Sequence, residues 1–182
     1  MEIVKNFARQ PPRYEPRTTI YAPCCTLPVQ MGREFPDNPL VGVGAVIVQE
    51  NRVLLIRRGQ PPLLGEWSVP GGVLECGETL REAVIREARE ETGLTVETGE
   101  MLGVYERIIR SEDGRVRYHY VLIDFLCRSA GGDLKAASDA ADVRWFAPEE
   151  LGALKLRPDT NEVIAKGLKR TMETATPPSL SS

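Results

Sequence analysis

Apolar residues recur along the chain with the spacing of strands in some segments and of helices in others. The stretch LVGVGAVIVQ (40–49) is β-branched and apolar on both faces, as expected for a buried strand. The residues ENR then turn the chain into VLLIRR (53–58), so residues 40–58 predict a β-hairpin. Residues 59–66 are rich in Gly and Pro and predict a loop. WSVPGG (67–72) predicts a short strand that ends in a Pro-Gly-Gly turn.

One later segment carries helix signals at both of its ends. Thr79 and Glu82 fit a capping box, in which each residue satisfies a backbone donor of the other. Gly93 fits the position that closes a helix, because glycine adopts the left-handed conformation needed there. These signals predict a helix over residues 79–92.

The rest of the chain reads mostly as strands. Strand-like stretches at 101–110 and 117–128 are joined by the turn signal SEDGR, and VRWF (143–146) is a further short strand. A short helical piece is predicted at 148–151 and a longer helix at 159–172. Strands in mixed order around a few helices favour an α+β fold or an α/β/α sandwich.

The predicted helix 79–92 carries three glutamates whose spacing needs an explanation. Glu87, Glu90 and Glu91 share one face, where like charges cost roughly 0.2–0.5 kcal/mol per pair in an isolated helix. On a helical wheel the apolar residues lie on that same side, whereas a solvated acidic face would lie opposite them. The alternative is an ordinary solvated face. We expect instead that the acids face inward and bind a hard divalent cation such as magnesium.

The composition is ordinary for a soluble globular protein. The 182 residues are 42% hydrophobic and 27% charged, with a formal net charge of −3. This length suits one domain with a hydrophobic core, and the charge balance disfavours a nucleic acid duplex as a partner. We see no signal peptide and no apolar run that would span a bilayer. We therefore expect a cytoplasmic protein that does not associate with membranes.

The four cysteines do not form a recognisable framework. Cys24 and Cys25 are adjacent, Cys76 and Cys127 stand apart, and the chain has one histidine, His119. This spacing matches neither a disulfide framework nor a complete zinc site. We expect free thiols in a reducing compartment.

The segment GGVLECGETLREAVIREAREETGL (71–94) resembles the Nudix box. The fixed positions of that motif are filled by Gly72, Glu78, Arg86, Glu87, Ala88, Glu90, Glu91, Gly93 and Leu94. The likeness extends over about residues 40–170, which include the GEWSVPGG and VRWF stretches. It implies a Nudix-type α/β/α sandwich with a mixed β-sheet. The implied activity is metal-dependent hydrolysis of a nucleoside diphosphate linked to another group.

The resemblance also implies roles for residues of the box. The expected metal is Mg²⁺, with Mn²⁺ as an alternative, and the ligands are Glu87, Glu90, Glu91 and the carbonyl group of Gly71. Glu87 and Glu91 are also expected to be catalytic. A structural role is implied for Gly72, Glu78, Arg86 and Gly93. Within that group, Arg86 and Glu78 would hold the preceding loop against the helix and orient Glu87.

Residues outside the box supply the remaining candidates. An acid that accepts the proton of the attacking water is expected at Asp139, with Asp142, Glu112 and Asp113 as further candidates. For Asp139 a plain loop aspartate is the alternative.

Two arginines and two aromatic residues also invite an interpretation. Arg57 and Arg58 end the second strand and are candidates to bind the substrate, since alternation turns one of them inward. A solvated strand end is the alternative for both. Trp67 reads as a core residue rather than a platform for a base, and His119 as a sheet residue rather than a catalytic base.

We therefore expect a Nudix hydrolase that cleaves ADP-ribose to AMP and ribose 5-phosphate. The alternatives are a MutT-type nucleoside triphosphate pyrophosphohydrolase and a Nudix-fold module that binds a nucleotide without cutting it. The partner is a small nucleotide, and the resemblance adds a possible homodimer. The expected division is an irregular extension (1–38), the Nudix domain (39–173) and a mobile tail (174–182).

Overall fold

The strand β1 (Leu40–Gln49) forms the centre of the sheet, as its two-sided apolar sequence requires. A computed structural model describes residues 33–175 of the chain. In it, β1 lies parallel to β6 (Val116–Gly132) and antiparallel to both β2 (Arg52–Arg58) and β4 (Gly71–Val73). The hairpin predicted over 40–58 is confirmed by the pairing of β1 with β2.

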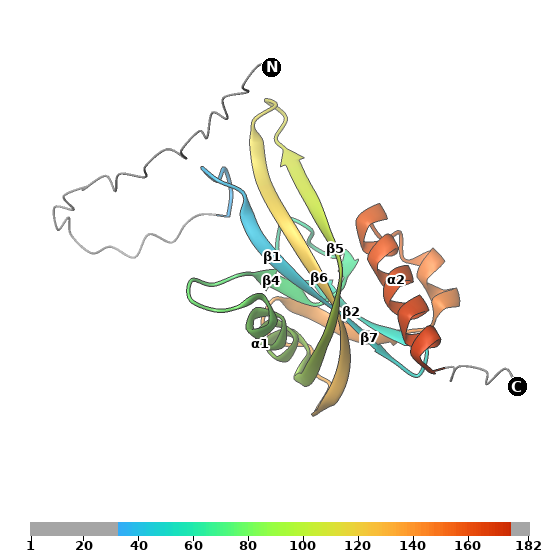
Figure 1. The fold of residues 1–182 in the computed structure, drawn as a ribbon. Helices are drawn as coiled ribbons and strands as arrows, with labels where there is room; N and C mark the ends of the chain where they lie inside the picture. Colours follow the sequence, from blue (N-terminus) through green and yellow to red (C-terminus); the bar gives the residue numbers. More distant parts are fainter. Residues whose placement is uncertain (1–32, 176–182) are drawn as a thin grey trace, which may run out of the picture. The chain divides into compact units, whose positions relative to one another are not determined.

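The remaining strands extend the sheet on both sides of β1. The strand order is β3-β2-β1-β6-β5, where β3 is Trp67–Ser68 and β5 is Leu94–Arg110. In addition, β4 pairs with β1, and β7 (Ala140–Phe146) pairs with β2. Both parallel and antiparallel neighbours occur, so the sheet is mixed (Figure 1).

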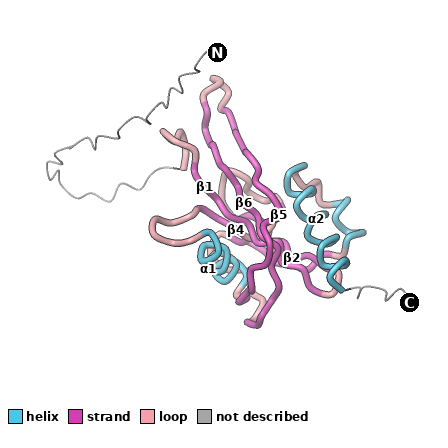
Figure 2. The backbone as a smooth tube through the Cα atoms, in the orientation of Figure 1, coloured by secondary structure: helices cyan, strands magenta, loops and turns pink. Residues whose placement is uncertain are grey.

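Two helices cover opposite faces of this sheet. Helix α1 (Leu80–Thr92) lies on one face, and α2 (Pro158–Ala175) lies on the other (Figure 2). A short 3-10 helix, η1 (Pro148–Ala153), precedes α2. The expected α/β/α sandwich is confirmed.

Alternation along β1 supplies both halves of the core. Val43, Ala45 and Ile47 face α1, and the even-numbered Val46 and Val48 face α2. The buried apolar residues of α1 are small, which brings the helix axis close to the sheet. They are Ala83, Val84 and Ala88. The α2 face is closed by Val163, Ile164 and Leu168.

The long hairpin of β5 and β6 is larger than its sequence pattern predicts. The stretches predicted at 101–110 and 117–128 are the middle of two strands that begin and end well beyond them. The pairing register shifts between Thr98 and Met101 and again before Gly103, which interrupts the apolar alternation. Those irregularities hide the first part of β5 from a pattern-based prediction.

The limits predicted for α1 are confirmed. The Thr79 hydroxyl accepts a hydrogen bond from Glu82 N at 3.3 Å, and the Glu82 carboxylate accepts one from Thr79 N at 2.7 Å. At the other end, Gly93 has φ of 74° and donates its N–H to Arg89 O at 2.9 Å. Because the Gly93 cap fixes where the last turn of α1 lies, it also fixes the position of the acids on that turn.

Two further observations concern the cysteines and membranes. Cys76 and Cys127 are free thiols, as expected, and Cys24 and Cys25 lie outside the described residues. Within residues 33–175 we find no helix with the length and apolar character needed to cross a membrane.

Substituting Gly93 by Ala should destabilise the fold by about 1–3 kcal/mol, because a side chain is strained at this φ. The added Cβ would also overlap the carbonyl oxygen of Asp133. Gly152→Ala in η1 is the matched control, since a Cβ there meets nothing within 4 Å. Urea unfolding of both variants measures the difference, and equal midpoints would contradict this account of the helix end.

Candidate active site

Glu91 is the most deeply buried charged residue of α1. It is 2% exposed, and its Oε2 accepts a hydrogen bond from Gly71 N at 2.8 Å. This contact ties the last turn of the helix to β4, which enters the sheet beside β1. The inward direction predicted for Glu91 from the helical wheel is confirmed.

Glu87 lies one turn earlier, directly against Gly72. A Cβ on that glycine would overlap the Glu87 carboxylate, so only glycine fits at this position. Arg86 donates to Glu87 Oε1 at 2.8 Å and to Glu78 Oε1 at 2.6 Å, and it reaches Val73 O at 3.2 Å. Arg86 therefore joins the loop before α1, the strand β4 and the Glu87 carboxylate.

Glu90 lies at the rim of the site. Its side chain is 50% exposed, and its Oε2 is 3.5 Å from Arg86 NH1. The wheel prediction that all three glutamates face inward therefore holds for Glu87 and Glu91, whereas Glu90 borders solvent. A position three residues after Glu87 falls at the edge of the buried stripe rather than at its centre.

Burial changes the protonation of the inner acids. It raises the pKa of Glu91 to about 7, although the Gly71 N–H and the charge of Arg58 both act in the opposite direction. Burial also raises the pKa of Glu87, and the hydrogen bond from Arg86 offsets part of that rise. For both carboxylates, the nearby positive charge is therefore too small to offset the loss of hydration.

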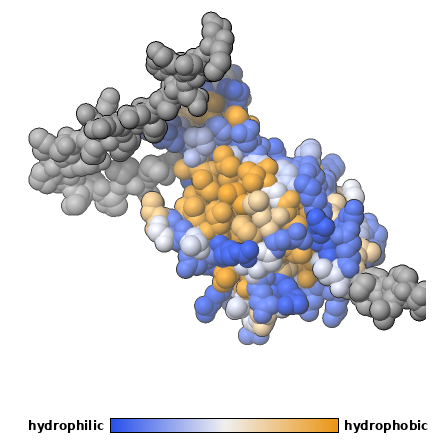
Figure 3. All heavy atoms as spheres, viewed as in Figure 1, coloured by the Kyte–Doolittle hydropathy of each residue, from blue (hydrophilic) through white to orange (hydrophobic). Residues whose placement is uncertain are grey.

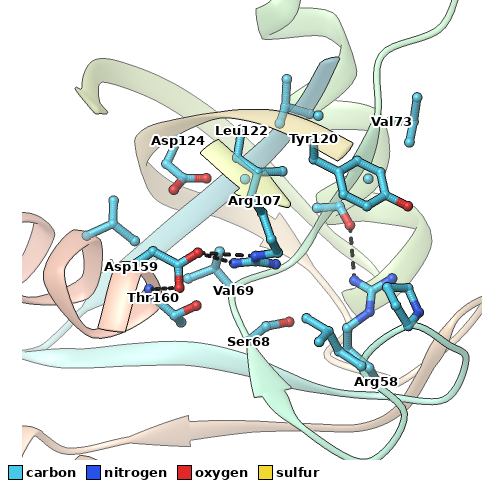
Figure 4. Close-up of a pocket in the computed structure, with 18 of the residues that line it drawn as sticks. Arg58, Ser68, Val69, Val73, Arg107, Tyr120, Leu122, Asp124, Asp159 and Thr160 are labelled. Carbon is cyan, nitrogen blue, oxygen red and sulfur yellow. Dashed lines mark hydrogen bonds and ion pairs between the residues drawn. The ribbon is translucent and has the colours of Figure 1, made fainter. Parts of the chain in front are cut away.

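Arg58 is the cation that approaches Glu91. Its NH1 lies 3.5 Å from the Gly71 carbonyl oxygen and 4.0 Å from Glu91 Oε1, and its side chain is 15% exposed (Figure 4). Arg57 is exposed, so alternation turns one of the two arginines inward, as predicted. The pairing of β2 with β7 shifts register between these two residues.

The donor set suits a hard divalent cation. It consists of carboxylate oxygens from Glu87, Glu90 and Glu91 and the carbonyl oxygen of Gly71, the ligand type that Mg²⁺ and Mn²⁺ prefer. Across residues 33–175, however, no three acidic, histidine or cysteine side chains are gathered closely enough to hold a metal as they stand. Arg58 and Arg86 provide the positive charge in this arrangement.

The acids proposed outside the box lie in different surroundings. Asp139 is close enough to Glu91 for its charge to contribute to the raised pKa of Glu91, after the larger effect of burial. Asp139 Oδ2 also lies 3.9 Å from Arg33 NH1. Asp142 is exposed and accepts a hydrogen bond from Val143 N.

The two acids of the β5–β6 turn contribute to the turn itself or face solvent. Asp113 accepts hydrogen bonds from the Ser111 hydroxyl at 2.6 Å and from Arg115 Nε at 2.7 Å, and Glu112 is exposed. Among the four candidates, the structure brings Asp139 next to the α1 carboxylates.

A cleft passes beside Gly71, the hydrogen-bond partner of Glu91, and extends over the sheet. It is lined by Arg58 and by glycines of β1 and β4, and it continues to Tyr120, Asp124, Arg107 and Asp159. Figure 4 shows that these side chains come from β5, β6 and the start of α2. The cleft therefore borders the Gly71 contact of Glu91 and contains the carboxylates of Asp124 and Asp159.

Sequence reasoning missed the part of this cleft that Arg107 and Asp159 line. Arg107 NH2 lies 2.5 Å from Asp159 Oδ2, a pair 52 residues apart in the chain. No local motif connects these two positions. A signal did exist for Asp124, which is an acid within the apolar stretch VLIDFLC of β6.

The two aromatic predictions are confirmed. The Trp67 ring packs edge-on against Phe146, with ring centroids 4.9 Å apart, and contributes to the core beneath α2. His119 lies within β6 and pairs with Ile108 of β5.

Comparison with known proteins shows which family this chain belongs to. A family model described as the NUDIX domain matches residues 38–167. The chain is 43% identical over 109 residues to the ADP-ribose pyrophosphatase of Methanocaldococcus jannaschii. The aligned region covers 60% of this chain and 62% of that protein. It thus spans less than two thirds of the length of that relative.

A second relative and a solved structure, both described by the name MutT, are also similar to this chain. A MutT-like protein of Streptomyces ambofaciens is 39% identical over 122 residues, covering 65% of this chain and 72% of that protein. The crystal structure of a MutT NUDIX hydrolase from Burkholderia pseudomallei superposes with a TM-score of 0.63 at 31% identity. That comparison covers 71% of this chain and 98% of the other.

Glu91→Gln should change how the stability of the metal-free protein depends on pH. The folded protein holds the Glu91 proton more tightly than the unfolded chain, since the pKa rises from 4.5 to about 7. Wild-type stability should therefore fall as the pH rises from about 4.5 to about 7, and remain lower above that. The variant should avoid this loss and gain up to about 3 kcal/mol over wild type at pH 8.

Urea unfolding in the presence of a chelator, at several pH values, measures this effect. Glu106→Gln on the exposed side of β5 is the matched control, because it makes the same chemical change outside the site. Parallel pH profiles for wild type and Glu91→Gln would rule out the buried-acid interpretation.

Proposed function

Because this chain belongs to the Nudix hydrolase family, we propose that its substrate is a nucleoside diphosphate linked to a further group, foremost ADP-ribose. The products would be AMP and ribose 5-phosphate. The similarity to a protein named ADP-ribose pyrophosphatase supports this choice. So does the cleft beside Gly71, which is lined by Arg58 and Arg107 and by apolar and aromatic residues that suit a nucleotide.

The contact of Glu91 with Gly71 carries the proposal. A buried acid, a backbone carbonyl and the Arg58 guanidinium meet at the end of the cleft. An arrangement of this kind suits a ligand that combines positive and negative charges, such as a diphosphate with its metal ion. A purely structural buried acid would be expected to have a cation closer than the 4.0 Å that separates Glu91 Oε1 from Arg58 NH1.

We infer that the metal is Mg²⁺, with Mn²⁺ as an alternative, held by the donor set described above. When bound, the metal neutralises charge on the diphosphate and makes water a better nucleophile. Arg58 would then leave Gly71 and Glu91, and its guanidinium would bind a phosphate oxygen. Arg57 stays the weaker candidate for substrate binding, because it is exposed.

The remaining roles follow from position. Glu87 and Glu91 are proposed to be catalytic, since their carboxylates belong to the donor set for the metal and lie against Gly72 and Gly71. Asp139 is proposed to accept the proton from the attacking water, because it lies near Glu91 and is partly exposed. A structural role, keeping the acids next to β4, is proposed for Gly72, Glu78, Arg86 and Gly93. The contacts of Arg86 with Val73 and Glu78 support it.

Two alternatives are retained for specific reasons. The similarity to a MutT-like protein and to a MutT NUDIX hydrolase favours a nucleoside triphosphate as the second candidate substrate. A binding module without activity is the third possibility, and it fits less well because every acid of the box is present. The division into an extension, a Nudix domain and a tail also stays a prediction.

A homodimer is the remaining proposal about partners. Apolar residues gather over β1 and β6 on the face that also carries α1 (Figure 3). Val41, Val104 and Ile108 are exposed apolar residues on β1 and β5, and register places them next to β6. Exposed apolar areas of this kind are typical of surfaces that bind another protein.

A substrate panel tests the proposed function. With Mg²⁺ present, ADP-ribose should be cleaved with a kcat/KM at least about tenfold above that for nucleoside triphosphates or dinucleotides. Product analysis should give AMP and ribose 5-phosphate. A preference for triphosphates would select the MutT-type alternative, and binding without turnover would select the module.

Glu91→Gln tests the metal site within the same assay. Turnover should fall on the order of a hundredfold or more, because an electrostatic contact to the reacting groups is lost. Wild type should gain thermal stability on addition of Mg²⁺, since a ligand of the folded state stabilises it, and the variant should gain less. The control Glu106→Gln should match wild type in both measurements. Full activity of Glu91→Gln would exclude the proposed role.

A further inference from the structure

Asp124 is a buried acid that lines the cleft on β6, across β1 from Gly71. It is 7% exposed and lies on β6 between Ile123 and Phe125. Its carboxylate takes part in no hydrogen bond or ion pair with any of residues 33–175. Such a group is costly to bury unless something else supplies its hydrogen bonds.

The cleft is where that missing partner would enter. Asp124 lines it, and Figure 4 shows the carboxylate near Arg107 and Asp159. Arg107 forms no hydrogen bond or ion pair with Asp124, because its guanidinium binds Asp159 through both Nε, at 3.2 Å, and NH2, at 2.5 Å. Burial raises the pKa of Asp124 to about 6, with Arg107 opposing and Asp159 adding to that rise.

The glycine row of the sheet fixes where the carboxylate lies. Gly44 of β1 pairs with Gly71 on one side and with Asp124 on the other. A Cβ on Gly44 would overlap Asp124 Oδ1, so the carboxylate leans across β1 in the space that this glycine leaves. Two strand spacings separate Gly71 from Asp124, on the order of 10 Å.

That separation matches the reach of a nucleotide. A diphosphate near Gly71 would leave the nucleoside over β1 and β6, within reach of Asp124. The walls there are suited to a flat ring, because Val69 and Leu122 are apolar and Tyr120 is aromatic. The partner of a carboxylate oxygen must be a hydrogen-bond donor, and bases present N–H groups at their edges.

We propose that Asp124 selects the nucleobase, by accepting a hydrogen bond from an N–H group such as the 6-amino group of adenine. This inference rests on the proposed function, since it assumes that a nucleotide occupies the cleft. It adds to that function a residue that determines specificity and lies across β1 from Gly71.

The test compares substrates that differ at the base alone. In inosine diphosphate ribose an oxygen replaces the 6-amino group of ADP-ribose, so it cannot donate to Asp124 from that position. Wild type should prefer ADP-ribose by about tenfold or more in kcat/KM. In Asp124→Asn, whose amide can donate to the oxygen, the preference should fall by about tenfold or more, or reverse.

Binding of the bare nucleotides gives a readout that does not depend on turnover. Calorimetry without metal should show that wild type binds AMP more tightly than IMP, and that Asp124→Asn loses this difference. Asp133→Asn is the matched control, because Asp133 is exposed and lies outside the cleft. Melting curves check the fold of each variant. Asp124→Asn should be at least as stable as wild type, since it removes an unpaired buried acid.

The outcomes separate this inference from the proposed function. An unchanged ratio in Asp124→Asn, with wild-type activity on ADP-ribose, would overturn the role of Asp124 and leave the function intact. Failure of wild type to cleave either substrate would overturn the function, and the AMP and IMP affinities would still decide the role of Asp124. If Asp124→Asn does not fold, Asp124→Ser serves instead, because its smaller side chain fits over Gly44.

Discussion

The contact between the last turns of α1 and the glycines of β4 is the constraint on which the site depends. Glu91 accepts a hydrogen bond from Gly71 N, and Glu87 lies in the space that Gly72 leaves open. Strand β4 in turn pairs with β1, the strand whose two apolar faces join both layers of the core. The carboxylates are therefore held by the same sheet that forms the fold, rather than by a separate loop.

This arrangement places carboxylates in the interior, where they lack the positive charge that a bound ligand or metal ion would supply. Burial raises the pKa of Glu91, Glu87 and Asp124, because each has lost more hydration than its neighbours return. Arg86 is tightly bound to Glu78 and Glu87, so it acts as a fixed part of the site. Arg58 is held more loosely, at 3.5–4.0 Å, and it can exchange its partners for those of a ligand.

The features that could be predicted from the sequence are those that depend on neighbouring residues alone. The capping box at Thr79 and the glycine at Gly93 set the limits of α1, and the helical wheel then gave the inward direction of Glu87 and Glu91. The wheel misplaced Glu90, because angle alone does not say how far the neighbouring chain covers a helix. The pair of Arg107 with Asp159 was invisible, since it arises where β5 and α2 meet after folding.

The glycines of β1 and β4 connect the two ends of the cleft. Gly72 makes room for Glu87 on the α1 side of the sheet, and Gly44 makes room for Asp124 on the α2 side. In both cases a carboxylate lies where a side chain would otherwise fill the interior, so neither acid serves packing. Because paired strands of a sheet keep a fixed spacing, the separation of Gly71 and Asp124, which flank Gly44 on its two sides, is fixed too. A ligand that contacts both must span two strand spacings, so the sheet itself selects for the length of the substrate.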